Sequence, residues 1–247
     1  MNLLKVQNLS FKYDWQWILE NVNFSLTPGK TLGIIGPNGG GKSTLLKLIA
    51  GLLKPTRGEI ELPRDVTLAW VPQKVELKST IPMTVRDFLS LFSSQNNQLI
   101  NSLGLSKKTN LLLENLSGGE LQRIFLARAL STQAKIILMD EPTTGLDSSG
   151  LDQLHNLIEN YKEKYKTSFI IVDHNINHMI KNCDHILCLN KGHHWHDHKD
   201  LLTKNILESI YHCEFEHLAI HERRGLDHDH KACDVHLNQK NTNESHK

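Results

Sequence analysis

The chain lacks a hydrophobic run of the length that crosses a membrane. Such a run needs about 18 consecutive apolar residues, and no segment of the 247-residue sequence approaches that length. We therefore expect no membrane-spanning helix. The first residues lead directly into a strand-like pattern, so we also expect no secretory leader. The length suits one large domain or two small ones.

Cysteine is scarce, and neither sign of charge is in excess. The 28 lysines and arginines stand against 27 aspartates and glutamates, for a net charge of +1. A dedicated nucleic-acid binder would carry a basic excess, so we expect no nucleic-acid partner. No two cysteines form a CxxC pair, and we interpret them as reduced thiols of a cytosolic protein. They are Cys183, Cys188, Cys213 and Cys233.

A glycine-rich stretch at residues 36–44 fits the pattern GxxxxGK[ST] of a phosphate-binding loop. A short apolar segment at 31–35 precedes it, and a helix-like segment at 45–50 follows it, which is the context that the pattern requires. Glycines let the loop turn its N–H groups toward phosphate oxygens, and the helix N-terminus adds partial positive charge. The alternative, a chance glycine-rich turn, is disfavoured by these flanking segments.

Individual residues of this loop have expected roles. Lys42 is expected to reach the β- and γ-phosphates, and the Ser43 hydroxyl to bind Mg²⁺. The residues expected to contact the nucleotide are Gly36, Pro37, Asn38, Gly39, Gly40, Gly41, Lys42, Ser43 and Thr44.

A second segment supplies acids. The apolar run at residues 136–139 ends in Asp140 and Glu141. A buried strand would deliver Asp140 to the coordination sphere of Mg²⁺, and Glu141 would lie beside the γ-phosphate, where it could polarise a water molecule. A strand that ends in a solvated acidic turn is the alternative interpretation.

A third segment, Ser117-Gly118-Gly119, precedes a helical pattern. Ser117 is a good N-cap, and the apolar spacing that follows is typical of an amphipathic helix. That alone would be an ordinary capped helix. A Ser-Gly-Gly start is also suited to binding phosphate.

Strand-like and helix-like segments alternate along the chain, which predicts a mostly parallel sheet covered on both faces. A polar helical pattern interrupts this order at 75–115. Strands are expected at residues 3–7, 22–27, 31–35, 59–62, 66–71, 135–139, 168–172 and 185–189, and helices at 118–131, 148–164 and 175–182.

The segment Leu116–Arg123 matches a motif specific to the nucleotide-binding subunits of ATP-binding cassette (ABC) transporters, which the chain resembles over residues 3–190. The resemblance implies that Gln73 is the glutamine of a coupling loop and a Mg²⁺ ligand beside Ser43 and Asp140. It implies that Asp147 lies at a subunit contact and that His174 is a switch histidine.

The resemblance also implies an aromatic residue that stacks on adenine. Tyr13 falls at that position, but Trp15 and Trp17 flank it and could take its place. Two other positions depart from the family pattern: Gly40 replaces a common alanine, and Asn175 a frequent aspartate.

The implied architecture is an α/β P-loop NTPase with an antiparallel N-terminal β-subdomain and a helical subdomain inserted at about 75–131. The nucleotide-binding domain would span 1–190, with an extension at 191–247. Two copies would face each other head to tail, so that Ser117, Gly118 and Gly119 of one close over ATP held by the other. The implied reaction is attack of water on the γ-phosphate, with Lys42, Glu141, His174 and Gln73 as catalytic residues.

Two features indicate the cargo. Segments 70–74, 79–85 and 184–190 resemble the ATP-binding subunit of bacterial high-affinity zinc importers, which also has a His-rich extension. In this chain 11 of 15 histidines lie at or after His193. Imidazole ligands suit zinc, but the spacing is not that of a closed structural site, and a solvated extension that scavenges metal weakly is the interpretation we favour for this segment. The candidate zinc ligands are His193, His194, His196, His198, His228 and His230.

The resemblance thus implies an ATP- and Mg²⁺-dependent zinc-import ATPase on the cytoplasmic face of the bacterial inner membrane. Its partners would be integral-membrane permease subunits and, through them, a periplasmic or extracellular metal-binding protein. Manganese or iron import is an alternative. A soluble ABC-type ATPase is another, but such proteins usually carry two cassettes or a long coiled-coil insertion, and this chain has neither.

Overall fold

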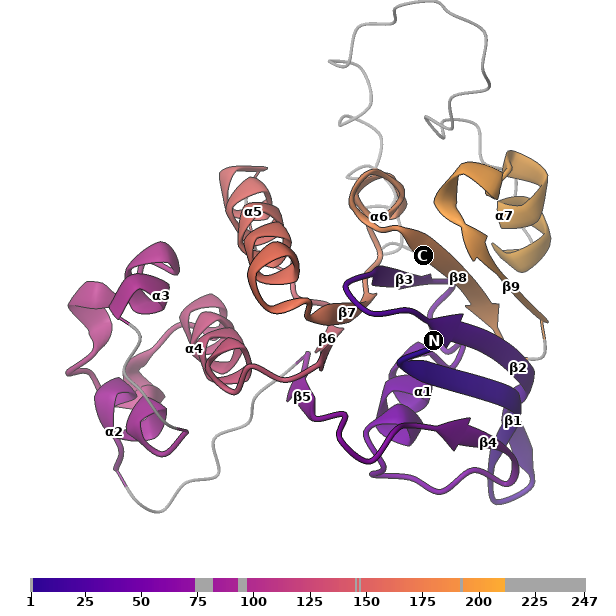
Figure 1. Ribbon diagram of the computed structural model, residues 1–247, viewed down its shortest axis with the longest axis horizontal. Helices are drawn as coiled ribbons and strands as arrows, with labels where there is room; N and C mark the ends of the chain where they lie inside the picture. Colours follow the sequence, from indigo (N-terminus) through magenta and orange to yellow (C-terminus); the bar gives the residue numbers. More distant parts are fainter. Residues whose placement is uncertain are drawn as a thin grey trace, which may run out of the picture.

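Two β-sheets and a laterally placed group of helices make up the protein (Figure 1). The computed structural model describes residues 2–73, 82–92, 97–144, 146, 148–191 and 193–211. Among the helices of these ranges, none has the length and apolar character to cross a membrane.

The smaller sheet is antiparallel and comes mainly from the N-terminal part of the chain. Its order is β2-β1-β4, with β1 at Leu4–Tyr13, β2 at Gln16–Leu26 and β4 at Arg57–Glu61. Strand β2 begins earlier than the expected strand at 22–27, because a tight hairpin at Asp14 and Trp15 pairs Tyr13 directly with Gln16. The implied antiparallel N-terminal subdomain is confirmed.

The larger sheet has the order β5-β6-β7-β3-β8-β9. All neighbouring strands in it run parallel except β8 and β9, which are antiparallel. This arrangement confirms the predicted mostly parallel sheet. The strands are β3 (Thr31–Ile35), β5 (Leu68–Val71), β6 (Ile136–Asp140), β7 (Ser168–Val172), β8 (His185–Asn190) and β9 (His193–His198).

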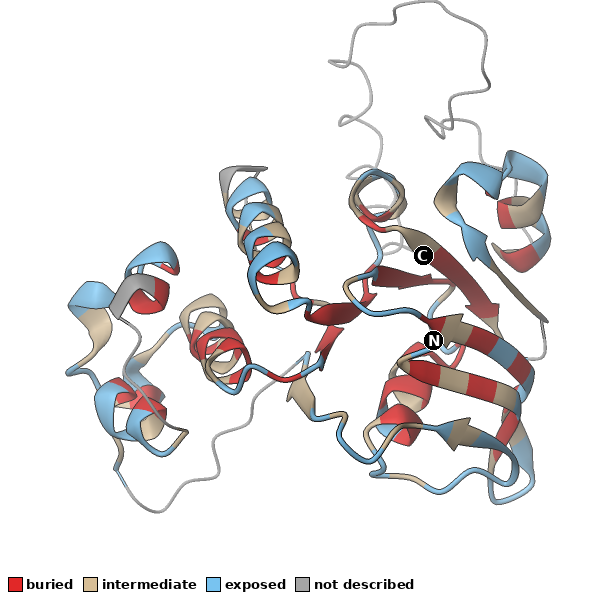
Figure 2. Ribbon diagram, in the orientation of Figure 1, coloured by how far each residue is buried: buried red, intermediate tan, exposed pale blue. Residues whose placement is uncertain are grey.

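Alternate residues of the central strands face two different cores, which is why these strands are continuously apolar. In β6, Ile136 and Leu138 pack with the smaller sheet and with α1 (Lys42–Ile49). Ile137 and Met139 belong to the opposite core, which α5 (Ser148–Tyr165) and α6 (Ile176–Asn182) help to cover. Figure 2 shows the central strands as buried between these layers.

The helical group lies between β5 and β6 in the sequence and beside the sheet in space (Figure 1). It contains α2 (Val85–Ser90), α3 (Asn97–Ser102), two short 3-10 turns at Ser106–Lys108 and Leu113–Asn115, and α4 (Gly118–Ser131). Helix α4 occupies the residues predicted for it. Its start is fixed by a capping box, in which the Ser117 hydroxyl and the Glu120 carboxylate each accept a backbone N–H of the other residue.

Strand β9 and helix α7 (Lys204–Tyr211) were not expected from the sequence. Strand β9 extends the larger sheet, with Trp195 opposite Cys188. Helix α7 buries Leu207 and Ile210, and the side-chain amide of Asn190 donates to the carbonyl of Ile210 at 2.7 Å. The described part of the histidine-rich extension is therefore packed against the body of the protein.

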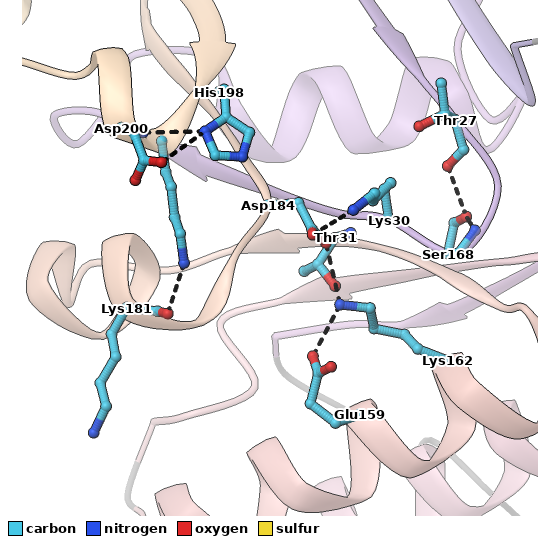
Figure 3. A network of polar contacts seen from close by, with 12 residues as sticks. Thr27, Lys30, Thr31, Glu159, Lys162, Ser168, Lys181, Asp184, His198 and Asp200 are labelled. Atoms are coloured by element: carbon cyan, nitrogen blue, oxygen red, sulfur yellow. Dashed lines mark hydrogen bonds and ion pairs between the residues drawn. The ribbon is translucent and has the colours of Figure 1, made fainter.

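A polar network joins the starts of β3 and β8 to α5 (Figure 3). The Asp184 carboxylate accepts hydrogen bonds from the Thr31 N–H, from Lys30 and from Lys162, at 2.8, 2.9 and 3.1 Å. Burial disfavours the charge of Asp184, but these donors outweigh it and lower the pKa to about 2. The network anchors the edge of the sheet opposite the glycine-rich loop.

Candidate nucleotide-binding site

The glycine-rich loop follows β3 and bends tightly into α1. At Gly36 the backbone φ is 152°, and a Cβ atom there would lie 2.0 Å from the carbonyl oxygen of Leu189 in β8. At Gly41, the N-cap of α1, φ is 95° and a Cβ atom would lie 2.6 Å from a methyl carbon of Leu19. Larger residues are excluded at both positions, because glycine is needed for the loop to pack against β8 and β2 in this conformation.

Lys42 lies at the start of α1, and its side chain folds back over the loop. Its ammonium group donates to the carbonyls of Gly36 and Pro37 at 2.8 and 2.9 Å. The residue is only 7% exposed. Burial lowers the pKa of Lys42, while the charges of Glu141 and Asp140 oppose that shift. A buried cation at this place suits an anionic phosphate.

Ser43 and Asp140 form the second element of the site. The Ser43 hydroxyl donates to Oδ1 of Asp140 at 3.2 Å, bringing α1 and the end of β6 together. Asp140 is 5% exposed, and burial raises its pKa, with the Ser43 hydrogen bond opposing the shift. Two hard oxygen donors side by side, one on a buried carboxylate that lacks full compensation, fit a Mg²⁺ ion.

The Glu141 carboxylate contacts two side chains that are distant from it in the sequence. His174 Nε2 lies 2.6 Å from Oε1 of Glu141, and the Gln73 amide donates to Oε2. The backbone of Glu141 is left-handed, with φ 53°. This turn directs the carboxylate to the place where Gln73, after β5, and His174, after β7, both reach it.

These residues surround one open cleft of about 520 Å³. The structure thus brings together residues that the sequence predicted from separate segments, because Lys42, Ser43, Gln73, Glu141 and His174 all line this cleft. The lining residues are Ile18, Asn38, Gly39, Gly40, Gly41, Lys42, Ser43, Thr44, Gln73, Glu141 and His174.

The Ser117-Gly118-Gly119 segment does not belong to the described lining of this cleft. It forms the start of α4, in the lateral helical group (Figure 1). A Cβ atom added at Gly118 or Gly119 would meet no atom of the described residues within 4 Å. Packing within this part of the chain therefore does not require glycine at either position.

The candidate aromatic residues lie on and beside the β1–β2 hairpin. Tyr13 packs edge-on against Phe11, with ring centroids 4.8 Å apart. Trp17 has Lys12 and Arg57 on its ring, at 5.7 and 5.4 Å from the centroid, and Trp15 is 92% exposed. Of this hairpin, Ile18 is the described residue that lines the cleft. The choice of stacking residue stays a prediction.

Some contacts were not anticipated. The Gln122 amide donates to the backbone oxygen of Glu141 at 2.9 Å. Asp173, 3% exposed, accepts from the Thr143 hydroxyl and from the Asn175 N–H. Asn175 caps α6 by accepting from the N–H of His178 at 3.0 Å, which explains how asparagine serves at this position. The sequence placed Gln122 within the motif at 116–123 but carried no sign of this bond.

Some of the candidate zinc ligands lie within the described residues. His228 and His230 lie outside them, as does Asp147 of the expected subunit contact, and only the backbone of His193 is described. His194 accepts a hydrogen bond from the N–H of Asn23 at 3.3 Å. Within the described ranges, no group of three or more His, Cys, Asp or Glu side chains is arranged to hold a metal ion.

The strand, glycine loop and helix, beside a strand that ends in acids, define a P-loop nucleoside triphosphatase. The capped Ser-Gly-Gly helix and the histidine after β7 narrow this class to the ATP-binding cassette. A family model described as ABC transporter matches residues 19–144, and the chain belongs to that family. It is accordingly an ATP-binding and ATP-hydrolysing transporter subunit, and family membership implies permease partners in the membrane.

Similar sequences carry a common name. The chain is 37% identical over 193 residues to the Zinc import ATP-binding protein ZnuC of Buchnera aphidicola subsp. Baizongia pistaciae, covering 76% of this chain and 80% of that protein. It is 36% identical to the protein of the same name from Pasteurella multocida, covering 76% and 73%, and 35% identical to that of Haemophilus influenzae, covering 76% and 72%.

Solved structures agree with the fold. A metal-chelate type ABC transporter in an inward-facing conformation matches with a TM-score of 0.74 and 29% identity, covering 85% of this chain and 89% of that chain. The ATP-binding subunit of another ABC transporter matches with a TM-score of 0.73 and 26% identity, covering 80% and 90%. The predicted fold class and family are confirmed, and the individual residue roles stay predictions.

Proposed function

We propose that this chain hydrolyses ATP to drive the import of zinc. One observation supports the hydrolytic centre above all: Lys42, Ser43 and Glu141 line one cleft, and the Ser43 hydroxyl donates to the Asp140 carboxylate. The cargo is supported by the similarity to proteins named Zinc import ATP-binding protein ZnuC, each matched over 76% of this chain.

The chemistry follows from the residues of the cleft. Loop N–H groups, the α1 N-terminus and Lys42 bind the phosphates and offset the charge that develops on them. Ser43 and Asp140, with Gln73, would hold Mg²⁺, which neutralises charge on the β- and γ-phosphate oxygens when it is bound. Most of the rate then comes from fixed charges and donors rather than from covalent steps.

Glu141 is proposed as the residue that orients or deprotonates the attacking water. Its two carboxylate oxygens contact His174 and Gln73, so both neighbours set its direction. His174 is also the group proposed to contact the γ-phosphate. Gln73 follows β5 and precedes the helical group, which makes it the proposed link between the nucleotide and transport.

The active form is proposed to be a head-to-tail dimer. The start of α4 does not line the cleft of its own chain, yet Gly118 and Gly119 leave open space that a Cβ atom would fill. A second copy would bring Ser117, Gly118 and Gly119 over the bound ATP, and Asp147 to the subunit contact. Closure of this dimer on ATP, and opening after hydrolysis, would drive the permease.

The remaining proposals concern location and metal. The chain would lie on the cytoplasmic face of the bacterial inner membrane, bound to permease subunits that receive zinc from a periplasmic or extracellular metal-binding protein. Zinc binding by the histidine-rich extension is proposed to involve residues beyond Tyr211, because tight zinc sites use three or four ligands and the described residues form no such group.

The test is metal uptake by a strain from which the gene is deleted, supplied with the parent chain or with Glu141→Gln. The parent is expected to restore growth under zinc chelation and uptake of radioactive zinc, and Glu141→Gln to restore neither. Restoration of manganese or iron uptake without zinc uptake would assign a different metal. Normal zinc uptake by the deletion strain under chelation would contradict the proposal.

A further inference from the structure

Gln122 joins helix α4 to the backbone of Glu141. Its side-chain amide donates to the Glu141 carbonyl oxygen at 2.9 Å, across 19 positions in the sequence. Gln122 lies on the first turns of α4, and its side chain lines a cleft together with Gly119, Pro142 and Leu146. The bond therefore connects the helix that begins at Gly118 with the end of β6.

The backbone at Glu141 needs such support. A non-glycine residue with φ 53° occupies a region that costs about 1 kcal/mol or more. The Glu141 N–H donates to the Val172 carbonyl at 2.8 Å. Its carbonyl accepts from Gln122 and, at 3.4 Å, from the Thr144 N–H. The shorter of these two bonds to the carbonyl is the one from α4.

A second contact ties α4 to the segment that carries Gln73. The Arg128 guanidinium donates to the Trp70 carbonyl in β5 at 2.6 Å, three residues before Gln73. Helix α4 is thus bonded to the main chain at Glu141 and to the main chain just before the glutamine that contacts the Glu141 carboxylate. A displacement of α4 would therefore shift the main chain at Glu141 and at Trp70.

We propose that Gln122 is a positioning residue: it holds the left-handed turn at Glu141 and makes the direction of that carboxylate depend on the placement of α4. This inference rests on the proposed role of Glu141 as the residue that activates water. Because α4 begins beside Ser117-Gly118-Gly119, the same helix that would cover ATP in the partner's site also adjusts the carboxylate in its own.

The experiment compares ATP hydrolysis by the full chain and two variants. Gln122→Met keeps the length of the side chain and removes the donor, and Gln122→Glu keeps its shape while placing an acceptor against the carbonyl. We expect kcat to fall about five- to tenfold in Gln122→Met and further in Gln122→Glu, in line with the loss of one hydrogen bond. KM for ATP is expected to stay within about twofold, because Gln122 does not line the nucleotide cleft.

Gln153→Met is the matched control. Gln153 lines the same cleft as Gln122, and no hydrogen bond from it to Glu141 occurs in the described part of the chain. Thermal melting of every variant shows whether a loss of kcat comes from misplacement of the carboxylate or from loss of stability. If Gln122→Met melts more than about 5 °C below the parent, Gln122→Glu takes its place in each comparison. A kcat equal to that of the parent, or an equal loss in the control, overturns the proposal.

A double variant, Gln122→Met combined with Glu141→Gln, distinguishes failure of this inference from failure of the proposed mechanism. If Glu141 activates water, Glu141→Gln alone is nearly inactive, and adding Gln122→Met lowers the residual rate no further. A multiplicative further loss would show that Gln122 acts elsewhere, and it would overturn the positioning role while leaving the role of Glu141 intact. A Glu141→Gln variant with the parental rate would instead remove the mechanism on which both depend.

Discussion

His174 Nε2 lies 2.6 Å from Oε1 of Glu141, and the Gln73 amide occupies the other oxygen of the same carboxylate. A histidine that follows β7 and a glutamine that follows β5 thus both contact Glu141, the acid that directly follows β6. These three strands are adjacent in the sheet, in the order β5-β6-β7. Parallel neighbours bring their carboxyl ends to one edge, so the topology itself assembles the group.

Substitution His174→Ala removes one of the two contacts that direct this carboxylate. We expect kcat for ATP hydrolysis to fall about a hundredfold, in the range of a lost general acid–base or orienting group, while ATP binding stays within about threefold. Steady-state hydrolysis and equilibrium binding of a fluorescent ATP analogue provide the two numbers. A parental kcat in this variant would show that the contact has no catalytic role.

The substitution Gly119→Ala tests whether this glycine is needed for the head-to-tail dimer site rather than for folding of the chain. Within the described residues a Cβ atom at Gly119 meets nothing within 4 Å, and alanine favours a helix over glycine by about 0.5–1 kcal/mol. We expect the melting temperature to stay the same or rise, while ATP hydrolysis falls at least about tenfold because the partner's nucleotide needs that space. Unchanged hydrolysis would argue against the head-to-tail site.

Acid is expected to weaken the fold through His196. Burial, and then the neighbouring His185, lower the pKa of His196 to about 4, whereas in the unfolded chain it is about 6.5. The unfolded state therefore takes up a proton first, so stability falls as the pH drops from about 6.5 to about 4. Urea unfolding across this range should show a shallower fall in His196→Phe, which keeps a ring against Phe24.

His198→Phe is the control for this titration. His198 belongs to the same strand, but its side chain is 47% exposed. The parental dependence on pH is expected to persist in His198→Phe. Equal slopes in the parent and in His196→Phe would show that His196 does not carry the effect.

A test of zinc binding by the extension requires a chain that is truncated after Tyr211. A chain that ends at Gly192 loses β9 and α7, with their buried Leu207 and Ile210, and we expect it to melt well below the parent. A chain that ends at Tyr211 keeps both elements. Calorimetric titration should find fewer zinc ions bound tightly by the chain that ends at Tyr211 than by the full chain. Equal stoichiometry would contradict a contribution from residues 212–247.

The motif residues were predictable because their chemistry restricts the sequence. A phosphate loop needs Gly36, Gly41 and Lys42 at fixed spacing. An apolar strand that ends in an acid, such as Asp140, predicts a Mg²⁺ ligand when it accompanies such a loop. The proximity of these residues follows from the parallel order of β6, β7 and β3, which brings the ends of these strands together.

Other features left no such pattern. Strand β9 is rich in histidine and lacks apolar alternation, so only its pairing with β8 reveals it. The Gln122 bond depends on the left-handed turn at Glu141, and a non-glycine residue gives no local sign of that conformation. Sequence therefore identified most of the polar groups that line the cleft, but not the contacts that hold them in place.

The role of Glu141 is tested most sharply by single-turnover ATP hydrolysis by Glu141→Gln beside the parent, with ATP affinity measured on the same preparations. The cleft geometry leaves the binding groups Lys42 and Ser43 untouched by this change. We expect the affinity for ATP to stay within about threefold while hydrolysis slows at least about a hundredfold. Hydrolysis at the parental rate with intact affinity would show that Glu141 does not activate the water.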